Sequence, residues 1–142
     1  MTVASILAVK GRAVTTAGQN DTIADVCRVL AEKRIGAVVV LDGDRIAGIA
    51  SERDMVRAFS KRGGDALADP VSTVMTADVV TCHEADTINS VMAKMSEGRF
   101  RHVPVVTNDR LAGLISIGDV VKARIAQIEA DAEQMRSYIA SA

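Results

Sequence analysis

The strongest constraint on this fold is that one stretch of the sequence occurs twice. Residues 48–54 read GIASERD and residues 113–119 read GLISIGD, and the alignment extends without a gap over residues 14–58 and 79–123. The two copies are offset by 65 residues (79 minus 14), which is a little above the roughly 20–50 residues of solenoid repeats, and the unit occurs only twice. The pattern therefore indicates an internal duplication.

Each copy places a serine three residues before an aspartate, where a β-rich run meets a helical pattern: Ser51 with Asp54, and Ser116 with Asp119. This is a variant of the capping box, in which the hydroxyl and the carboxylate satisfy free backbone N–H groups at a helix start. The same turn can also hold an anion on those N–H groups and a ribose diol on the carboxylate. Capping is enough to explain one such turn, but two at equivalent positions favour a binding function.

Each copy is predicted to fold as a β-α-β-β-α unit. In the first copy, a β-rich segment at 14–16 precedes an amphipathic helix that is capped by Thr22 and ended by Gly36. A continuous apolar run at 37–41 indicates a strand covered on both faces, and a tight turn and a partner strand follow it. The second helix opens at Ser51.

The fold class is therefore α+β. A small three-stranded sheet needs a cover, so we expect the two copies to pack about a pseudo-twofold axis. Segments 3–7 and 70–75 are interpreted as lead-in turns that tuck apolar side chains beside each unit, with Pro70 at the first helical position. The predicted divisions are a first repeat at 3–62, a linker and lead-in turn at 63–78, a second repeat at 79–123 and a C-terminal helix extension at 124–142.

The C-terminal segment is predicted to be a long helix with an apolar seam. Its apolar residues recur at alternating spacings of four and three: Val121, Ile125, Ile128, Ala132, Met135 and Ile139. The helix could fold back on its own repeat, or the seam could meet a second chain. We favour the second chain, and hence a homodimer.

Composition excludes several classes of function. The net charge of −1 and an aromatic content of 2% argue against a nucleic-acid partner. We expect no membrane span and a cytoplasmic location, because no apolar run reaches about 18 residues. Cys82 and His83 point to opposite faces of an extended chain and cannot form a nucleophile-base pair, and no spaced metal ligands accompany them. We therefore expect no catalytic residues and no metal.

The duplicated Ser-x-x-Asp turn, the run AVVV at 37–40 and the run RHVPVV at 101–106 resemble a pair of CBS domains, known as the Bateman module. The resemblance covers residues from about 3 to 123, and the chain looks like the stand-alone CBS-pair proteins of bacteria. It implies a regulatory sensor that binds AMP, ADP, ATP, NAD(H) or another adenosine ligand between the repeats and acts on a regulated protein of unknown identity.

The resemblance also implies binding residues. Asp54 and Asp119 would take the ribose, with Ser51 and Ser116 toward the phosphate. The adenine would meet the first strand of the opposite repeat, and cations at the start of the long strand would face the phosphates. The implied nucleotide-binding set is Ser51, Arg53, Asp54, Val79 and Val80 at one site and Val14, Thr15, Thr16, Ser116 and Asp119 at the other, with Arg101 and His102 as the cations and Gly36 and Ala37 at the matching positions of the first copy. Because Gly36 and Ala37 stand where the second copy has Arg101 and His102, the two sites are predicted to differ in their affinity for phosphate.

Two alternatives remain open at this stage. An interaction adaptor without a ligand would have the same fold, and an enzyme is the least favoured class.

Overall fold

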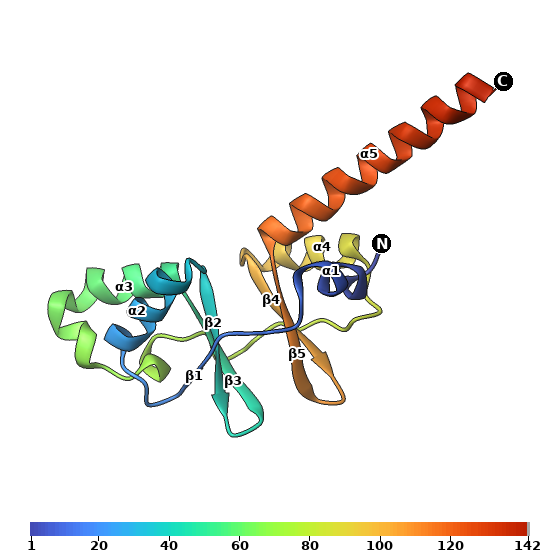
Figure 1. Cartoon of the computed structure of the whole chain (residues 1–142). Helices are drawn as coiled ribbons and strands as arrows, with labels where there is room; N and C mark the ends of the chain where they lie inside the picture. The colour runs from blue at the N-terminus through green and yellow to red at the C-terminus, as the bar shows by residue number, and fades with distance from the viewer. Residues whose placement is uncertain (142) are drawn as a thin grey trace.

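The computed structural model describes residues 1–141 and shows two similar halves and one long helix that projects from them (Figure 1). In the first half, β1 pairs in parallel with β2, and β2 pairs antiparallel with β3. In the second half, β4 pairs antiparallel with β5. The elements in chain order are α1 (Val3–Lys10), β1 (Thr16–Gly18), α2 (Ile23–Lys33), β2 (Ala37–Asp42), β3 (Arg45–Ser51), α3 (Glu52–Arg62), the short 3-10 helices η1 (Gly63–Ala68) and η2 (Val71–Thr73), α4 (Ile88–Gly98), β4 (His102–Thr107), β5 (Arg110–Ser116) and α5 (Ile117–Ser141).

The α+β class and the duplication are confirmed. The strands β3 and β5, which are equivalent in the two copies, contact each other, as packing about a pseudo-twofold axis requires. The predicted strand at 37–41 is the central strand β2, and its first four residues are buried. Val38 and Val40 belong to the core on one sheet face, while Val39 is fully buried outside that core. Since side chains alternate along a strand, β2 is covered on both faces.

The helix starts agree with the prediction, but one helix end does not. Thr22 caps α2 by accepting from the backbone N–H of Asp25 at 3.2 Å. The helix then ends at Lys33, and Arg34 takes the left-handed conformation with φ 54°. Arg99 has φ 56° at the same position after α4. The prediction that Gly36 ends the helix is wrong, because arginine in both copies adopts the backbone turn that glycine was expected to provide.

The second copy lacks the third strand that the repeat predicted. In the first copy, the N–H of Val39 donates to the carbonyl of Thr15 at 3.3 Å and helps to hold the first strand. The equivalent residue is Pro104, which has no N–H to donate. Only a single parallel bridge between Cys82 and Val105 remains, so the sheet of the second half has two strands.

The lead-in segments pack against the opposite copies, which differs from the sequence interpretation. Val3, Ile6 and Leu7 of α1 are buried in the core of the second half. Ala66 and Val71 of the linker are buried in the core of the first half. Thus each lead-in crosses to the copy that it does not precede, and the two halves are interlocked through both segments. Pro70 is the cap of η2 rather than its first helical residue.

These lead-ins explain why a glycine precedes both Ser-x-x-Asp turns. A β-carbon on Gly48 would lie 2.6 Å from Met75 Sδ and 2.8 Å from the carbonyl oxygen of Thr76. A β-carbon on Gly113 would lie 2.7 Å from a methyl group of Leu7. The repeated glycine is therefore the surface on which each lead-in lies.

Gly48→Ala is expected to destabilise the fold by about 1–3 kcal/mol, because the methyl group would press on the linker backbone. That backbone is fixed by a pair of hydrogen bonds between Ile49 and Thr76 at 3.0 and 2.9 Å, so it cannot move aside cheaply. Urea denaturation measures the loss. Gly64→Ala is the control, because nothing lies within 4 Å of its β-carbon. Equal urea midpoints for the two variants would contradict this packing.

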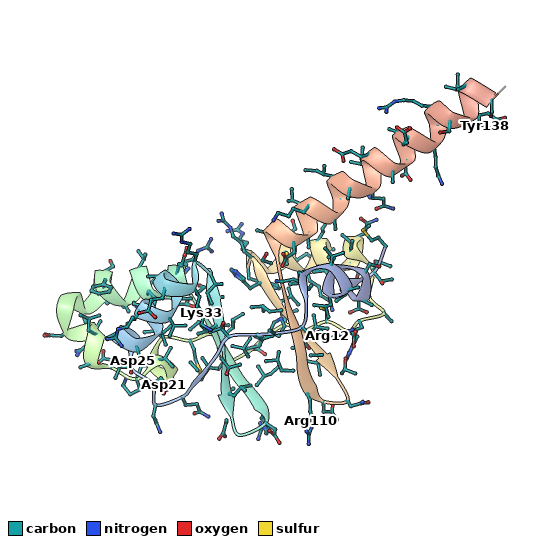
Figure 2. All side chains as sticks on the ribbon, viewed as in Figure 1. Arg12, Asp21, Asp25, Lys33, Arg110 and Tyr138 are labelled. Atoms are coloured by element: carbon teal, nitrogen blue, oxygen red, sulfur yellow. The ribbon has the colours of Figure 1, made fainter. Side chains whose placement is uncertain are left out.

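The long C-terminal helix is confirmed, and most of it touches nothing else in the described chain. Val120 is the only buried residue of α5. Figure 2 shows Tyr138 near the far end of α5, beyond the two halves. The alternative in which the seam folds back on its own repeat is therefore wrong for residues up to Ser141. The last residue of the predicted extension, Ala142, lies outside the described residues.

Candidate functional site

The strand registers bring the two Ser-x-x-Asp turns to the middle of the molecule. Ser51 pairs with Ala37 at the start of β2, and Ser116 pairs with His102 at the start of β4. The two strand starts lie against each other, since a β-carbon on Gly36 would be 3.1 Å from the imidazole of His102. The Asp54 turn (residues 51–54) and the Asp119 turn (residues 116–119) therefore flank the contact between the halves.

The Asp54 turn is a capping box with one carboxylate oxygen to spare. The N–H of Ser51 donates to Asp54 Oδ2 at 2.9 Å, and the Ser51 hydroxyl donates to the same oxygen at 3.1 Å. Asp54 is 7% exposed, yet no buried side-chain oxygen among the described residues lacks a partner. Because Oδ1 makes none of the hydrogen bonds of residues 1–141, it must touch solvent. This oxygen can accept a hydrogen bond from a ligand.

The Asp119 turn has the same cap and an added cation. The N–H of Ser116 donates to Asp119 Oδ2 at 2.9 Å, and the N–H of Asp119 donates to the Ser116 hydroxyl at 3.2 Å. Lys10, the last residue of α1, donates to Asp119 Oδ2 at 2.6 Å and to the carbonyl of Leu114 at 2.8 Å. The crossed lead-in therefore delivers an ammonium group onto one of the two turns.

Lys10→Met is expected to remove a pH-dependent part of the stability. Burial alone would raise the pKa of Asp119, but the hydrogen bonds from Lys10 and Ser116 outweigh it and hold the pKa below its ordinary 3.8. A carboxyl group whose pKa is lower in the folded chain stabilises the fold at pH values above its pKa in the unfolded chain. This stabilisation is lost as the pH falls through the pKa of the folded chain. The expected loss near pH 7 is about 0.5–1 kcal/mol for this partly screened pair.

Urea denaturation between pH 7 and pH 2.5 tests this linkage. The difference between wild type and Lys10→Met should shrink as Asp119 becomes protonated. Lys33→Met is the control, because Lys33 is exposed and makes no ion pair among residues 1–141. A difference that is constant over this pH range would contradict the linkage.

The surroundings of His102 disfavour the positive charge that the sequence suggested. Burial, followed by the nearby Lys10, lowers the pKa of its imidazole from the ordinary 6.5. Protonation of the ring is therefore less favourable than that of a free imidazole, and the ring can serve as a hydrogen-bond partner. The packing of the two halves thus disfavours a positive charge on His102 in the ligand-free chain, and its contact with a phosphate stays a prediction.

The remaining cations are placed differently around the two turns. Arg101 is exposed, and its carbonyl accepts from the N–H of Ile117, the first residue of α5. Arg53 lies on the first turn of α3 and donates to the carbonyl of Arg99 in the other half at 3.4 Å. The residue equivalent to Arg53 is Gly118, so each turn has cations that the other lacks.

The segments predicted to meet the adenine are extended and accessible. Thr15 is bound to β2 through Val39, while Val79 and Val80 precede the bridge at Cys82 beside β4. Val80 is 42% exposed, which is high for a hydrophobic residue. Each segment thus lies next to a strand start at the centre of the molecule, and no hydrogen bond within residues 1–141 joins it to Asp54 or Asp119.

Two hollows in the structure do not include either aspartate of the turns. An open apolar groove of about 510 Å³ runs between α2 and α3 and is lined by Cys27, Leu30, Ala31, Glu52, Met55, Val56 and Phe59. A small hollow of about 40 Å³ includes Thr16. Neither is lined by Asp54 or Asp119, although Glu52 of the Asp54 turn borders the groove, so the candidate site rests on the hydrogen-bonding groups of the turns.

The candidate nucleophile is inaccessible. Cys82 is fully buried, and burial raises the pKa of its thiol to about 11. The His83 ring is bonded to the carbonyl of Val106 at 3.1 Å. Among residues 1–141, no three His, Cys, Asp or Glu side chains gather closely enough to hold a metal ion. No helix in the same range is long and apolar enough to cross a membrane.

Comparison with known families gives the duplication its name. The family model of the CBS domain matches this chain twice, over residues 8–61 and 71–126. The chain is a tandem pair of CBS domains. A relative is itself named a CBS domain-containing protein, and one solved neighbour, 44% identical, is named a signal-transduction protein with CBS domains.

Solved CBS pairs share the fold over nearly the whole chain. The CBS-domain containing protein ATU1752 from Agrobacterium tumefaciens is 47% identical with a TM-score of 0.86, and the match covers 87% of this chain and 99% of that one. The CBS domain protein PAE2072 from Pyrobaculum aerophilum, complexed with AMP, is 28% identical with a TM-score of 0.75 and coverages of 84% and 89%.

A curated relative is longer than this CBS pair. The mitochondrial CBS domain-containing protein CBSX3 of Arabidopsis thaliana is 29% identical over 125 residues. The match covers 84% of this chain and 61% of the relative, so the chain spans about three-fifths of that protein's length.

Lys10 is the residue that sequence reasoning missed in this CBS pair. It is separated from Asp119 by 109 positions and precedes the other repeat. Its only signal is its place at the end of a lead-in that crosses to the second half, and the repeat alignment does not include that segment.

Proposed function

We propose that this CBS pair is a regulatory sensor that binds an adenosine-containing ligand at the Asp54 and Asp119 turns. The observation that carries the proposal is the pair of capping boxes in which Oδ2 holds the helix start and Oδ1 makes no hydrogen bond with residues 1–141. A carboxylate so fixed is oriented before the ligand arrives, and the helix N-terminus beside it favours an anionic group.

The bound neighbour supports the class of ligand. PAE2072, a CBS pair with the same fold, was solved with AMP. In our proposal the ribose diol binds Oδ1 of each aspartate, with Ser51 and Ser116 toward the phosphate. The adenine lies against residues 79–80 at the Asp54 site and residues 14–16 at the Asp119 site. AMP, ADP, ATP and NAD(H) share these groups, so all of them belong to the candidate set.

A thermal-shift screen of the full chain against AMP, ADP, ATP, NADH and S-adenosylmethionine tests the function. A ligand that binds only the folded state at 100 times its Kd stabilises the fold by about 2.7 kcal/mol, which is several degrees in Tm. Guanosine and cytidine monophosphates are the controls. A chain that responds to none of the adenosine ligands at millimolar concentration would be an interaction adaptor, and the proposal would be wrong.

The two sites are expected to differ in affinity. The Asp119 site has Arg101 and Lys10 within reach, whereas Gly36 and Ala37 replace Arg101 and His102 beside the Asp54 turn. Charge-assisted bonds to phosphate are roughly twice as strong as neutral ones. Calorimetric titration with AMP should therefore give two affinities, and Arg101→Ala should weaken one of them. Two equal affinities that do not respond to Arg101→Ala would count against this asymmetry.

We also propose that the chain is a homodimer that acts on a regulated protein. The exposed apolar faces of α5 and of the α2–α3 groove support a second copy, since contiguous apolar surface is uncommon on a soluble monomer. The cytoplasmic location stays a prediction from the sequence.

A further inference from the structure

We infer that α5 pairs in parallel and in register with α5 of a second copy, as a two-stranded coiled coil. The inference deepens the homodimer proposed above and does not depend on nucleotide binding. Three observations carry it: an uncovered apolar stripe, the spacing of that stripe and the charges on its two sides.

The large side chains of the stripe are exposed, and only Ala132 is half-buried. Ile125 is 51% exposed, Ile128 56%, Met135 61% and Ile139 67%. Figure 1 shows why: α5 leaves the second half after its first turns and runs away from both sheets. In the part of the chain that the structure describes, no other element covers these residues. Their burial requires another molecule.

The spacing of the stripe identifies the kind of partner. Alternating steps of four and three residues average 3.5, which is the heptad repeat of a left-handed coiled coil. In this frame the a positions are Ile125, Ala132 and Ile139, and the d positions are Val121, Ile128 and Met135. A heptad seam is complementary to an identical seam, so a second α5 fits it. The stripe from Val121 to Ile139 is about 27 Å long at 1.5 Å per residue.

The flanking charges choose the parallel arrangement. In a parallel pair, each g residue lies beside the e residue five positions later on the other helix. Arg124 at g would meet Glu129 of the second copy, and Asp131 at g would meet Arg136 of the second copy. Both contacts are attractive, and the twofold symmetry doubles them. All four side chains are exposed. Arg136 donates to Glu133 at 3.0 Å and Arg124 to Gln127 at 3.4 Å within the helix, and such solvent-exposed contacts are weak enough to exchange for contacts between helices.

The antiparallel arrangement gives the opposite result. Full overlap of two antiparallel stripes sets Lys122 beside Arg136 of the second copy, and sets Glu129 and Asp131 each beside its own counterpart. All of these contacts are between like charges. Sliding the helices by one heptad removes the repulsion but leaves one end of the stripe unpaired. Only the parallel pair buries every layer with favourable charges on both sides.

Disulfide trapping in the full chain tests the orientation. In a Cys27→Ser background, Ile139→Cys should give a covalent dimer on a non-reducing gel after mild oxidation, because identical a positions adjoin in a parallel pair. In the full-overlap antiparallel pair the same cysteines would be about 27 Å apart. Ser137→Cys is the matched control, because Ser137 is exposed and occupies the f position on the outer face of the helix. This variant should remain uncrosslinked.

Charge exchange tests the register. Glu129→Lys should raise the dimer dissociation constant about tenfold, because it repels Arg124 of the second copy twice in the dimer. Adding Arg124→Glu to the same chain should restore the wild-type value. These two residues are five apart and do not face each other on one helix, so the rescue reports a contact between helices.

The possible results of these experiments distinguish the coiled coil from the homodimer proposal and from nucleotide binding. Light scattering that shows a monomer at micromolar concentration would overturn both the coiled coil and the homodimer. A dimer in which Ile139→Cys does not crosslink, as when α5 lies in the α2–α3 groove of the second copy, would overturn the coiled coil alone. A mass of three chains would overturn the two-stranded pair. Nucleotide binding is measured independently by the thermal shift.

Discussion

Replacing Asp54 or Asp119 with alanine is expected to weaken adenine-nucleotide binding at the corresponding site about 10- to 100-fold, because each loses a charged hydrogen bond worth about 1.5–3 kcal/mol. The carboxylate is held by the N–H of its own serine at 2.9 Å in both turns, so it is already oriented for the ribose. Titration calorimetry of each single variant with AMP measures the effect. The double variant should bind AMP and ATP about 10- to 100-fold more weakly at both sites.

A matched control separates binding from helix capping. Asp25 occupies the same first-turn position of α2, where its N–H donates to the Thr22 cap, and it lies on a helix of the first half rather than at the central turns (Figure 2). Asp25→Ala should therefore leave nucleotide affinity unchanged. If the double variant of Asp54 and Asp119 binds AMP, ATP and NADH as the wild type does, the proposed ribose contacts are wrong.

Leu7→Ala is expected to destabilise the second half of the molecule, although Leu7 precedes the first half in the sequence. Leu7 is 1% exposed and lies over Gly113 in the core that contains Val103 and Val105. Truncation of a buried leucine costs about 2–5 kcal/mol, and here it leaves a cavity against β5. Urea denaturation gives the loss, and amide hydrogen exchange locates it.

Val71→Ala is the companion variant, because Val71 is fully buried in the core of the first half. Exchange should accelerate first in β4 and β5 for Leu7→Ala, and first in β2 and β3 for Val71→Ala. The opposite assignment, or a uniform acceleration in both variants, would contradict the crossed lead-ins.

Local features of the fold were predictable from the sequence, because they depend on neighbours along the chain. The caps at Thr22 and Ser51 and the buried run of β2 follow from residue spacing alone. The lost strand of the second copy was also readable, since Pro104 replaces Val39 and cannot donate a hydrogen bond. The matched residues of the two copies do not reveal this difference, because they do not show that the backbone N–H is missing at Pro104.

The rest of the site depends on contacts between distant residues. The crossing of α1 places Leu7 in the core of the second half. This contact joins residues far apart in the sequence, so no local pattern predicts it. Lys10 reaches Asp119 only through this crossing. The lowered pKa of His102 has the same origin, since the packing of the two halves buries its ring. Residue types identified the candidate groups, and tertiary packing set their charges.

Photoaffinity labelling is the sharpest test of the proposed site, because it locates the adenine. The full chain would be irradiated with 8-azidoadenosine monophosphate and digested, and the labelled peptides identified by mass spectrometry with excess AMP as competitor. We predict that the label falls on peptides containing residues 79–80 or 14–16 and disappears with AMP. Label confined to the α2–α3 groove, or label that AMP does not displace, would contradict binding at the Asp54 and Asp119 turns.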